Sequence, residues 1–87
     1  MKDVSIRDYI GYSKELTAEQ VRKLTPGSVV RMHSLDRYGA HQYLDMTVVQ
    51  SGKKKVLVAT SFYGDRVERP IRTATDRMCY TEVKHDD

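Results

Sequence analysis

The chain has 87 residues, of which 39% are hydrophobic and 31% charged, and its formal net charge is +3. This length allows one domain with one small core and excludes an internal cavity for a large cofactor. A single cysteine excludes an intrachain disulfide and a cysteine-based zinc site, and no apolar run has the length of a membrane span or signal peptide. We therefore expect one soluble, cytoplasmic domain over residues 1–87 with no cofactor.

Residues 1–27 are expected to form a helical segment that packs on a sheet. The apolar spacing over 6–10 fits a short helix or turn. The clearer signal is Thr17 with Gln20 three residues later, the spacing of a helix capping box. The helix predicted over 17–24 ends before Pro26, because the residue before a proline leaves the α region. It is too short to be stable alone in water and must pack on the sheet.

The sequence of the remainder of the chain predicts β-structure. Strands are predicted at 28–34, 43–50, 55–62, 67–73 and 78–84, because apolar and β-branched residues cluster or alternate there between turn signals. The central feature is a hairpin over 43–63, whose turn contains Gly52. Val48 can pair with Leu57 or with Val56, and the sequence leaves both registers open. Pro70 confines its strand to an edge or a bulge.

These elements predict a mainly β (α+β) fold. The expected form is a five-stranded antiparallel sheet or an SH3-like barrel over 28–84, preceded by one short N-terminal helix and followed by a mobile tail at 85–87. The tight second hairpin and the long loop at 35–42 fit the layout of an SH3-like barrel. This is a likeness to a fold shared by unrelated functions, so it does not indicate an activity.

The predicted β region is the basic part of the chain, with ten basic and six acidic residues over 28–84. Lys53, Lys54 and Lys55 lie at the predicted hairpin tip, where ammonium groups can meet phosphates. The competing interpretation is a solvated turn that keeps the hairpin soluble and discourages edge pairing.

Arginines and tyrosines supply the other candidate contacts. Arg66, Arg69 and Arg72 carry forked donors suited to phosphate or carboxylate, although interleaved acidic residues could pair with them instead. Tyr38 and Tyr63 are placed near loops, where they could stack on bases or grip peptides. The competing interpretation is that Tyr38 and Tyr43 cap the barrel ends with their hydroxyls in water. Phe62 is expected to face the core if residues 56, 58 and 60 face inward.

Catalytic and metal-binding signals are weak. His33 and His41 would approach each other if their strands pair, with Asp36 or Asp45 nearby, but a metal site needs three or four converging ligands. Cys79 lies in an alternating strand and is expected to be a small core residue. We therefore expect no metal site, no catalytic residues, no enzymatic activity and no small-molecule substrate.

Two functions fit these observations. The first is a protein-binding regulatory or adaptor domain, including an inhibitor of a larger enzyme, of the kind common in phage and mobile-element genomes by analogy. Its contact surfaces would be the helix at 17–24 and the edge near Pro70, which could also pair two copies into a homodimer. The alternative is a basic module that binds DNA or RNA through the candidate lysines, arginines and tyrosines. The sequence favours the first, because the arginines are interleaved with acids, and no membrane partner is expected.

Overall fold

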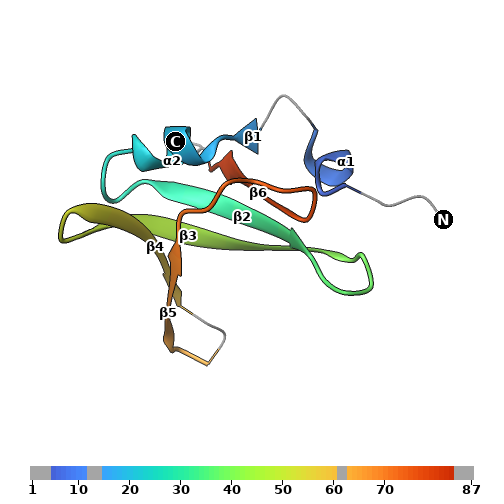
Figure 1. Ribbon diagram of the computed structural model, residues 1–87. Helices are drawn as coiled ribbons and strands as arrows, with labels where there is room; N and C mark the ends of the chain where they lie inside the picture. The colour runs from blue at the N-terminus through green and yellow to red at the C-terminus, as the bar shows by residue number, and fades with distance from the viewer. Residues whose placement is uncertain (1–4, 12–14, 61–62, 84–87) are drawn as a thin grey trace.

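The computed structural model describes residues 5–11, 15–60 and 63–83. Its elements, in chain order, are α1 (Arg7–Ile10), β1 (Glu15–Leu16), α2 (Ala18–Arg22), β2 (Val29–Leu35), β3 (His41–Ser51), β4 (Lys54–Thr60), β5 (Arg66–Pro70) and β6 (Met78–Glu82). The strands form one antiparallel sheet in the order β1-β6-β2-β3-β4-β5 (Figure 1). The prediction of a small, mainly β fold is confirmed, but the sheet has six strands and not five.

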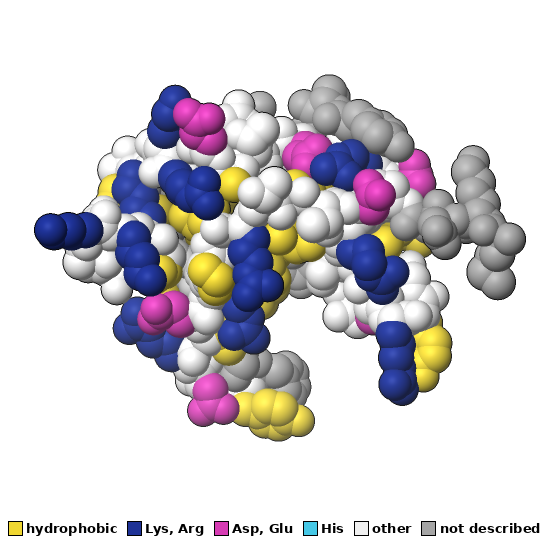
Figure 2. Space-filling view, in the orientation of Figure 1, with side chains coloured by type: hydrophobic (Ala, Val, Ile, Leu, Met, Phe, Trp, Pro, Cys, Tyr) yellow, Lys and Arg dark blue, Asp and Glu magenta, His cyan; other side chains and the backbone are white. Residues whose placement is uncertain are grey.

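The sheet is open. Its outer strands are β1 and β5, and each pairs with only one strand among the described residues, so the sheet alternative holds and the SH3-like barrel is not found. Pro70 lies in the edge strand β5, as its missing backbone donor requires. Figure 2 shows an arched outline, in which β5 and the turn between β2 and β3 project from the same side of the body.

The β3–β4 hairpin has the first of the two predicted registers. Val48 pairs with Leu57, and Ser51 pairs with Lys54 across a two-residue turn. Gly52, the first turn residue, has a φ of +62°, which a glycine adopts without steric cost and which a type II′ turn requires. This register sets which side chains of the two longest strands share a face.

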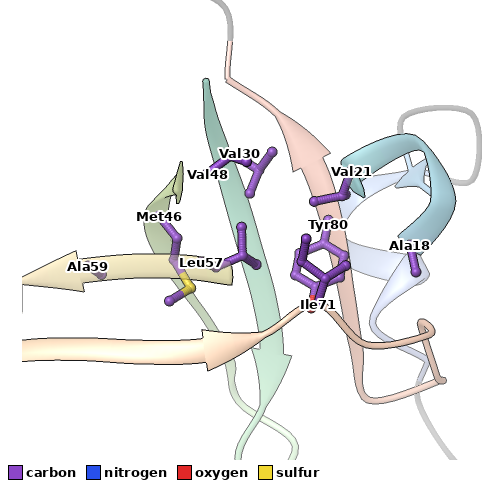
Figure 3. Packing of buried hydrophobic residues seen from close by; sticks show 9 residues of the cluster. All are labelled: Ala18, Val21, Val30, Met46, Val48, Leu57, Ala59, Ile71 and Tyr80. Atoms are coloured by element: carbon purple, nitrogen blue, oxygen red, sulfur yellow. The ribbon is translucent and has the colours of Figure 1, made fainter. Parts of the chain in front are cut away.

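One face of the sheet carries the main core, drawn in Figure 3. Met46, Val48 and Leu57 are fully buried there, together with Tyr80 from β6. Each such side chain contributes roughly 1.5–3 kcal/mol by leaving water. The core cluster also holds further residues of β2, β4, α2 and the segment after β5: Ala18, Val21, Val30, Ala59 and Ile71.

Helix α2 forms and packs as its sequence predicts, although it ends two residues earlier, at Arg22. The Thr17 hydroxyl accepts a hydrogen bond from the Gln20 amide (3.1 Å), and the Gln20 side chain accepts one from the Thr17 amide (2.8 Å). This reciprocal capping box satisfies two donors that a helix start leaves open. Val21 is buried on the sheet and Leu24 packs beside it.

The opposite face carries a smaller cluster under α1, made by Ile6, Leu35 and Cys79. Cys79 is fully buried, so it is the small core residue that its strand position indicates. Burial raises the pKa of its thiol to about 11, which keeps it protonated and unreactive at neutral pH.

The predicted inward face of β4 is wrong for the main core. Leu57 and Ala59 belong to that cluster, whereas Thr60 is exposed. Val56 is buried on the other face of the sheet, so both faces of this apolar run are covered. The sequence therefore does not show which alternate residues of β4 face the main core. Phe62 lies outside the described residues. Across the described ranges, no helix is long and apolar enough to span a membrane.

Candidate functional site

A basic groove lies where the β3–β4 turn meets α2. It is a hollow of about 310 Å³ lined by Arg22, Gln50, Lys53, Lys54 and Lys55, and we call it the basic groove. Its lining therefore has four cations and no acidic residue. Figure 2 shows Lys and Arg side chains gathered over this end of the molecule, at the left of the view.

Two of these cations are held in place by backbone carbonyls. The Lys55 ammonium donates to the carbonyls of Arg22 and Leu24, both at 2.8 Å, and the Arg22 guanidinium donates to the carbonyl of Ile71 at 3.2 Å. The Lys55 contacts also satisfy carbonyls at the end of α2, where a cation is favoured by the helix dipole. Because a carbonyl is a neutral acceptor, each cation is positioned while its full charge remains available to an anion.

Among the described residues outside the basic groove, four of the eight cations are paired with carboxylates. Arg7 pairs with Glu15, Arg31 with Asp45, Lys23 with Glu19 and Arg66 with Glu68. Such pairs neutralise their local charge, although exposed ones add little stability. The basic groove differs from these ion pairs because no acidic residue lines it. This difference matters as well as the number of its cations.

The sequence-predicted contact residues fall into two groups. The three lysines are brought together in the basic groove, whereas the arginines and tyrosines named with them are not part of its lining. Arg69 donates to the backbone carbonyl of Glu68 at 3.2 Å, and Arg72 is exposed on the segment after β5. Tyr38 and Tyr63 are 80% and 87% exposed, and Arg37 lies 4.9 Å over the Tyr38 ring.

A second and larger hollow, of about 770 Å³, lies over the sheet between α1 and the start of α2. Aromatic rings and imidazoles form much of its lining, and we call it the tyrosine–histidine hollow. Its residues are Tyr9, Ile10, Glu15, Leu16, Gln20, Arg31, His33, His41, Tyr43, Thr81 and Glu82. Gln20 lines this hollow and Arg22 lines the basic groove, so α2 separates the two.

The two histidines meet, as the strand pairing predicts. His33 Nδ1 and His41 Nε2 are 2.8 Å apart, and His33 Nε2 lies 2.8 Å from the Thr81 hydroxyl. Burial, followed by the nearby His41 and Arg31, lowers the pKa of His33 to about 4. His33 is therefore neutral at pH 7, and the pair shares one hydrogen bond. Asp45 is engaged by Arg31, and no metal-binding group of three His, Cys, Asp or Glu exists in the described ranges.

Aromatic contacts extend from this histidine pair. The Tyr9 ring stacks on His41 with centroids 5.1 Å apart, and Tyr43 is tilted toward both imidazoles at 6.2 Å. The Arg31 guanidinium lies over the Tyr43 ring, 4.4 Å from the ring centroid. These imidazoles and tyrosines form a continuous aromatic wall, a surface suited to planar or cationic groups.

Sequence reasoning missed several residues of these hollows. Arg22 and Gln50 join the groove only because α2 packs at the hairpin end, which no local pattern indicates. Tyr9 falls within the apolar spacing of residues 6–10, although its side chain is half exposed. The approach of strands carrying His33 and Tyr43 could have placed Tyr43 in the cluster, because they are direct cross-strand partners.

Fold and surface together define a small mainly β protein with an open six-stranded sheet and two hollows of different chemistry. Comparison with protein-family models, curated proteins and solved structures gave no match for this chain. Its functional assignment therefore depends on the geometry described above.

Proposed function

We propose that this protein is a non-enzymatic nucleic-acid-binding accessory module. The observation that supports this most directly is the basic groove, in which Arg22, Lys53, Lys54 and Lys55 converge without a lining acid. Phosphates in a strand are regularly spaced anions, and clustered cations bind them by releasing condensed counterions. Two of the four cations are already positioned by carbonyls, which lowers the entropy lost on binding.

The lysines are assigned distinct roles in this function. Lys53 and Lys54 are exposed and contact phosphates directly, while Lys55 and Arg22 form the base of the site. Arg69 of β5 adds long-range attraction over a Debye length of ~8–10 Å, because Glu68 is paired with Arg66. Sequence discrimination is not expected, because phosphate contacts position a protein without reading bases.

Salt-dependent binding tests this proposal. Fluorescence anisotropy with single- and double-stranded oligonucleotides at ~50 and ~200 mM salt should show an affinity that falls steeply with salt. In the Lys53→Gln/Lys54→Gln variant, the slope of log K against log salt should decrease by roughly 1.4–1.8, since each phosphate contact contributes ~0.7–0.9.

The matched control is the Lys23→Gln/Arg66→Gln variant, which removes the same charge from residues paired with carboxylates. Its slope should stay close to that of the unmodified protein. No binding at ~50 mM salt would reject the proposal, and so would an equal loss of slope in both variants.

A protein partner is the second candidate function, and the edge strand β5 favours it. This strand pairs only with β4 among the described residues, and most of its side chains are exposed. An open edge can accept a strand from an adaptor target, from an enzyme under regulation or from a second copy of the chain. Capture of partners from lysate with and without nuclease separates the two functions, because only protein contacts persist after the nucleic acid is removed.

A further inference from the structure

Outside the basic groove, four cations form no ion pair with a described carboxylate, and they lie on or beside the segment that connects β5 to β6. They are Arg37 in the turn between β2 and β3, Arg69 in β5, and Arg72 and Arg77 in the connecting segment. Figure 2 shows Lys and Arg side chains from the groove end across the middle of this face to the projecting turn, with Asp and Glu toward its margins. Positive charge therefore extends well beyond the groove.

The connecting segment, residues 71–77, links the basic groove to the β2–β3 turn. At one end, the Arg22 guanidinium that lines the groove donates to the carbonyl of Ile71 at 3.2 Å. At the other end, the Arg77 guanidinium donates to the carbonyl of Asp36 in the turn at 2.6 Å. Figure 1 shows the segment crossing the sheet between these two places. An extended chain of this length spans at most roughly 20 Å, so one short oligonucleotide can reach both ends.

The cations along this path are positioned in the same way as those of the groove. Arg69 donates to the carbonyl of Glu68 at 3.2 Å, and Arg77 also donates only to backbone carbonyls. Arg72 is exposed, and its amide donates to the Tyr80 hydroxyl at 3.1 Å, which fixes the backbone that carries it. Neutral acceptors leave the charge of these arginines available to phosphate oxygens, for which a guanidinium fork is well suited.

The turn at the far end of the path presents an aromatic ring beside a cation. Tyr38 is 80% exposed, and the Arg37 guanidinium lies 4.9 Å over its ring. The Asp36 carboxylate accepts hydrogen bonds from the amides of Tyr38 and Ala40, at 2.8 and 2.9 Å, so the turn is held in shape. A tyrosine in such a position stacks on an unpaired base, whereas a base inside a duplex is already stacked on its neighbours.

We propose that a single-stranded nucleic acid runs from the basic groove along residues 71–77 to the β2–β3 turn. Its phosphates contact Arg72 and Arg37, and one unpaired base stacks on Tyr38. This inference rests on the proposed nucleic-acid function and adds two things to it, the path of the strand and a preference for single strands.

Fluorescence anisotropy with labelled oligothymidylates of two lengths tests the path. About 4 nucleotides fill the groove alone, whereas about 12 reach the turn. For the longer oligomer, Arg37→Gln/Arg72→Gln should reduce the slope of log K against log salt by roughly 1.4, since each phosphate contact to a single strand contributes ~0.7. The slope for the shorter oligomer should not change. Lys23→Gln/Arg66→Gln, which removes two carboxylate-paired cations, is the matched control and should keep both slopes.

The preference for single strands is tested by removing the ring. Tyr38→Ala should weaken the binding of the longer single strand about fivefold or more, with an unchanged salt slope, because stacking is not ionic. Binding of a duplex of the same length should stay as it is. Tyr38→Phe retains the ring and should retain the affinity. The side chain is exposed, so both variants should keep the fold.

The outcomes separate this inference from the function on which it rests. An unreduced slope in Arg37→Gln/Arg72→Gln would overturn the path, and an equal loss of single-strand and duplex binding in Tyr38→Ala would overturn the stacking role. In either case the Lys53→Gln/Lys54→Gln variant still decides whether the groove binds phosphates. No binding of either oligomer by the unmodified protein at ~50 mM salt would overturn both proposals.

Discussion

Lowering the pH from 7.5 to 5 should reduce the free energy of unfolding by about 2 kcal/mol through His33 alone. Burial and the neighbouring His41 lower the pKa of His33 from 6.5 to about 4 in the folded protein. The unfolded chain therefore takes up a proton near pH 6.5, whereas the folded chain takes it up only near pH 4. Stability is complete above pH 6.5 and falls by up to ~1.4 kcal/mol per pH unit between these values.

Urea denaturation followed by far-UV circular dichroism at pH 7.5, 6 and 5 measures this loss. In the His33→Gln variant the free energy at pH 7.5 should be lower, but its decrease toward pH 5 should be largely abolished. Asp45 does not interfere, because Arg31 lowers its pKa below 3.8 and its contribution is lost only at more acidic pH. An equal pH dependence in both proteins, or none in the unmodified protein, would refute the linkage to His33.

Three further substitutions test the contacts that hold the fold. Lys55→Met should lower the free energy of unfolding by about 1 kcal/mol, because it uncaps the carbonyls at the end of α2, whereas Lys54→Met should leave the free energy of unfolding within ~0.5 kcal/mol. Thr17→Ala should cost about 1 kcal/mol by removing the capping box, measured by urea denaturation against Thr17→Ser, which retains the acceptor. Tyr80→Phe should cost about 1 kcal/mol in the same assay, because the Arg72 amide loses its acceptor, and an unchanged midpoint would contradict that role.

Much of the fold could be predicted from local sequence patterns, because the tertiary structure keeps the elements that these patterns favour. The capping box at Thr17, the glycine turn at 52 and the edge position of Pro70 each rest on the conformational limits of one or two residues. By contrast, β1 is only two residues long, Glu15–Leu16, and exists because β6 lies beside it. A strand that short has no periodicity of its own to detect.

The candidate sites were less predictable than the fold. The lysine cluster is visible in the sequence, but the contact of Lys55 with α2 depends on packing between segments more than thirty positions apart. The pairing of the strands that carry His33 and Tyr43 could be predicted from the sequence. This pairing correctly predicted that the two histidines approach each other. The arginines of 66–77 could not be divided into paired and unpaired ones without coordinates, since each has acidic neighbours on the chain.

The position of β6 inside the sheet, between β1 and β2, has a consequence for biosynthesis. Glu15 pairs with Thr81, so the N-terminal strand must wait for residues that leave the ribosome 66 positions later. At ordinary translation rates that delay is roughly 3–13 s. Once β2 has left the ribosome, the nascent chain exposes the edge of β2 that β6 will later occupy, and a chaperone or another nascent chain can compete for it.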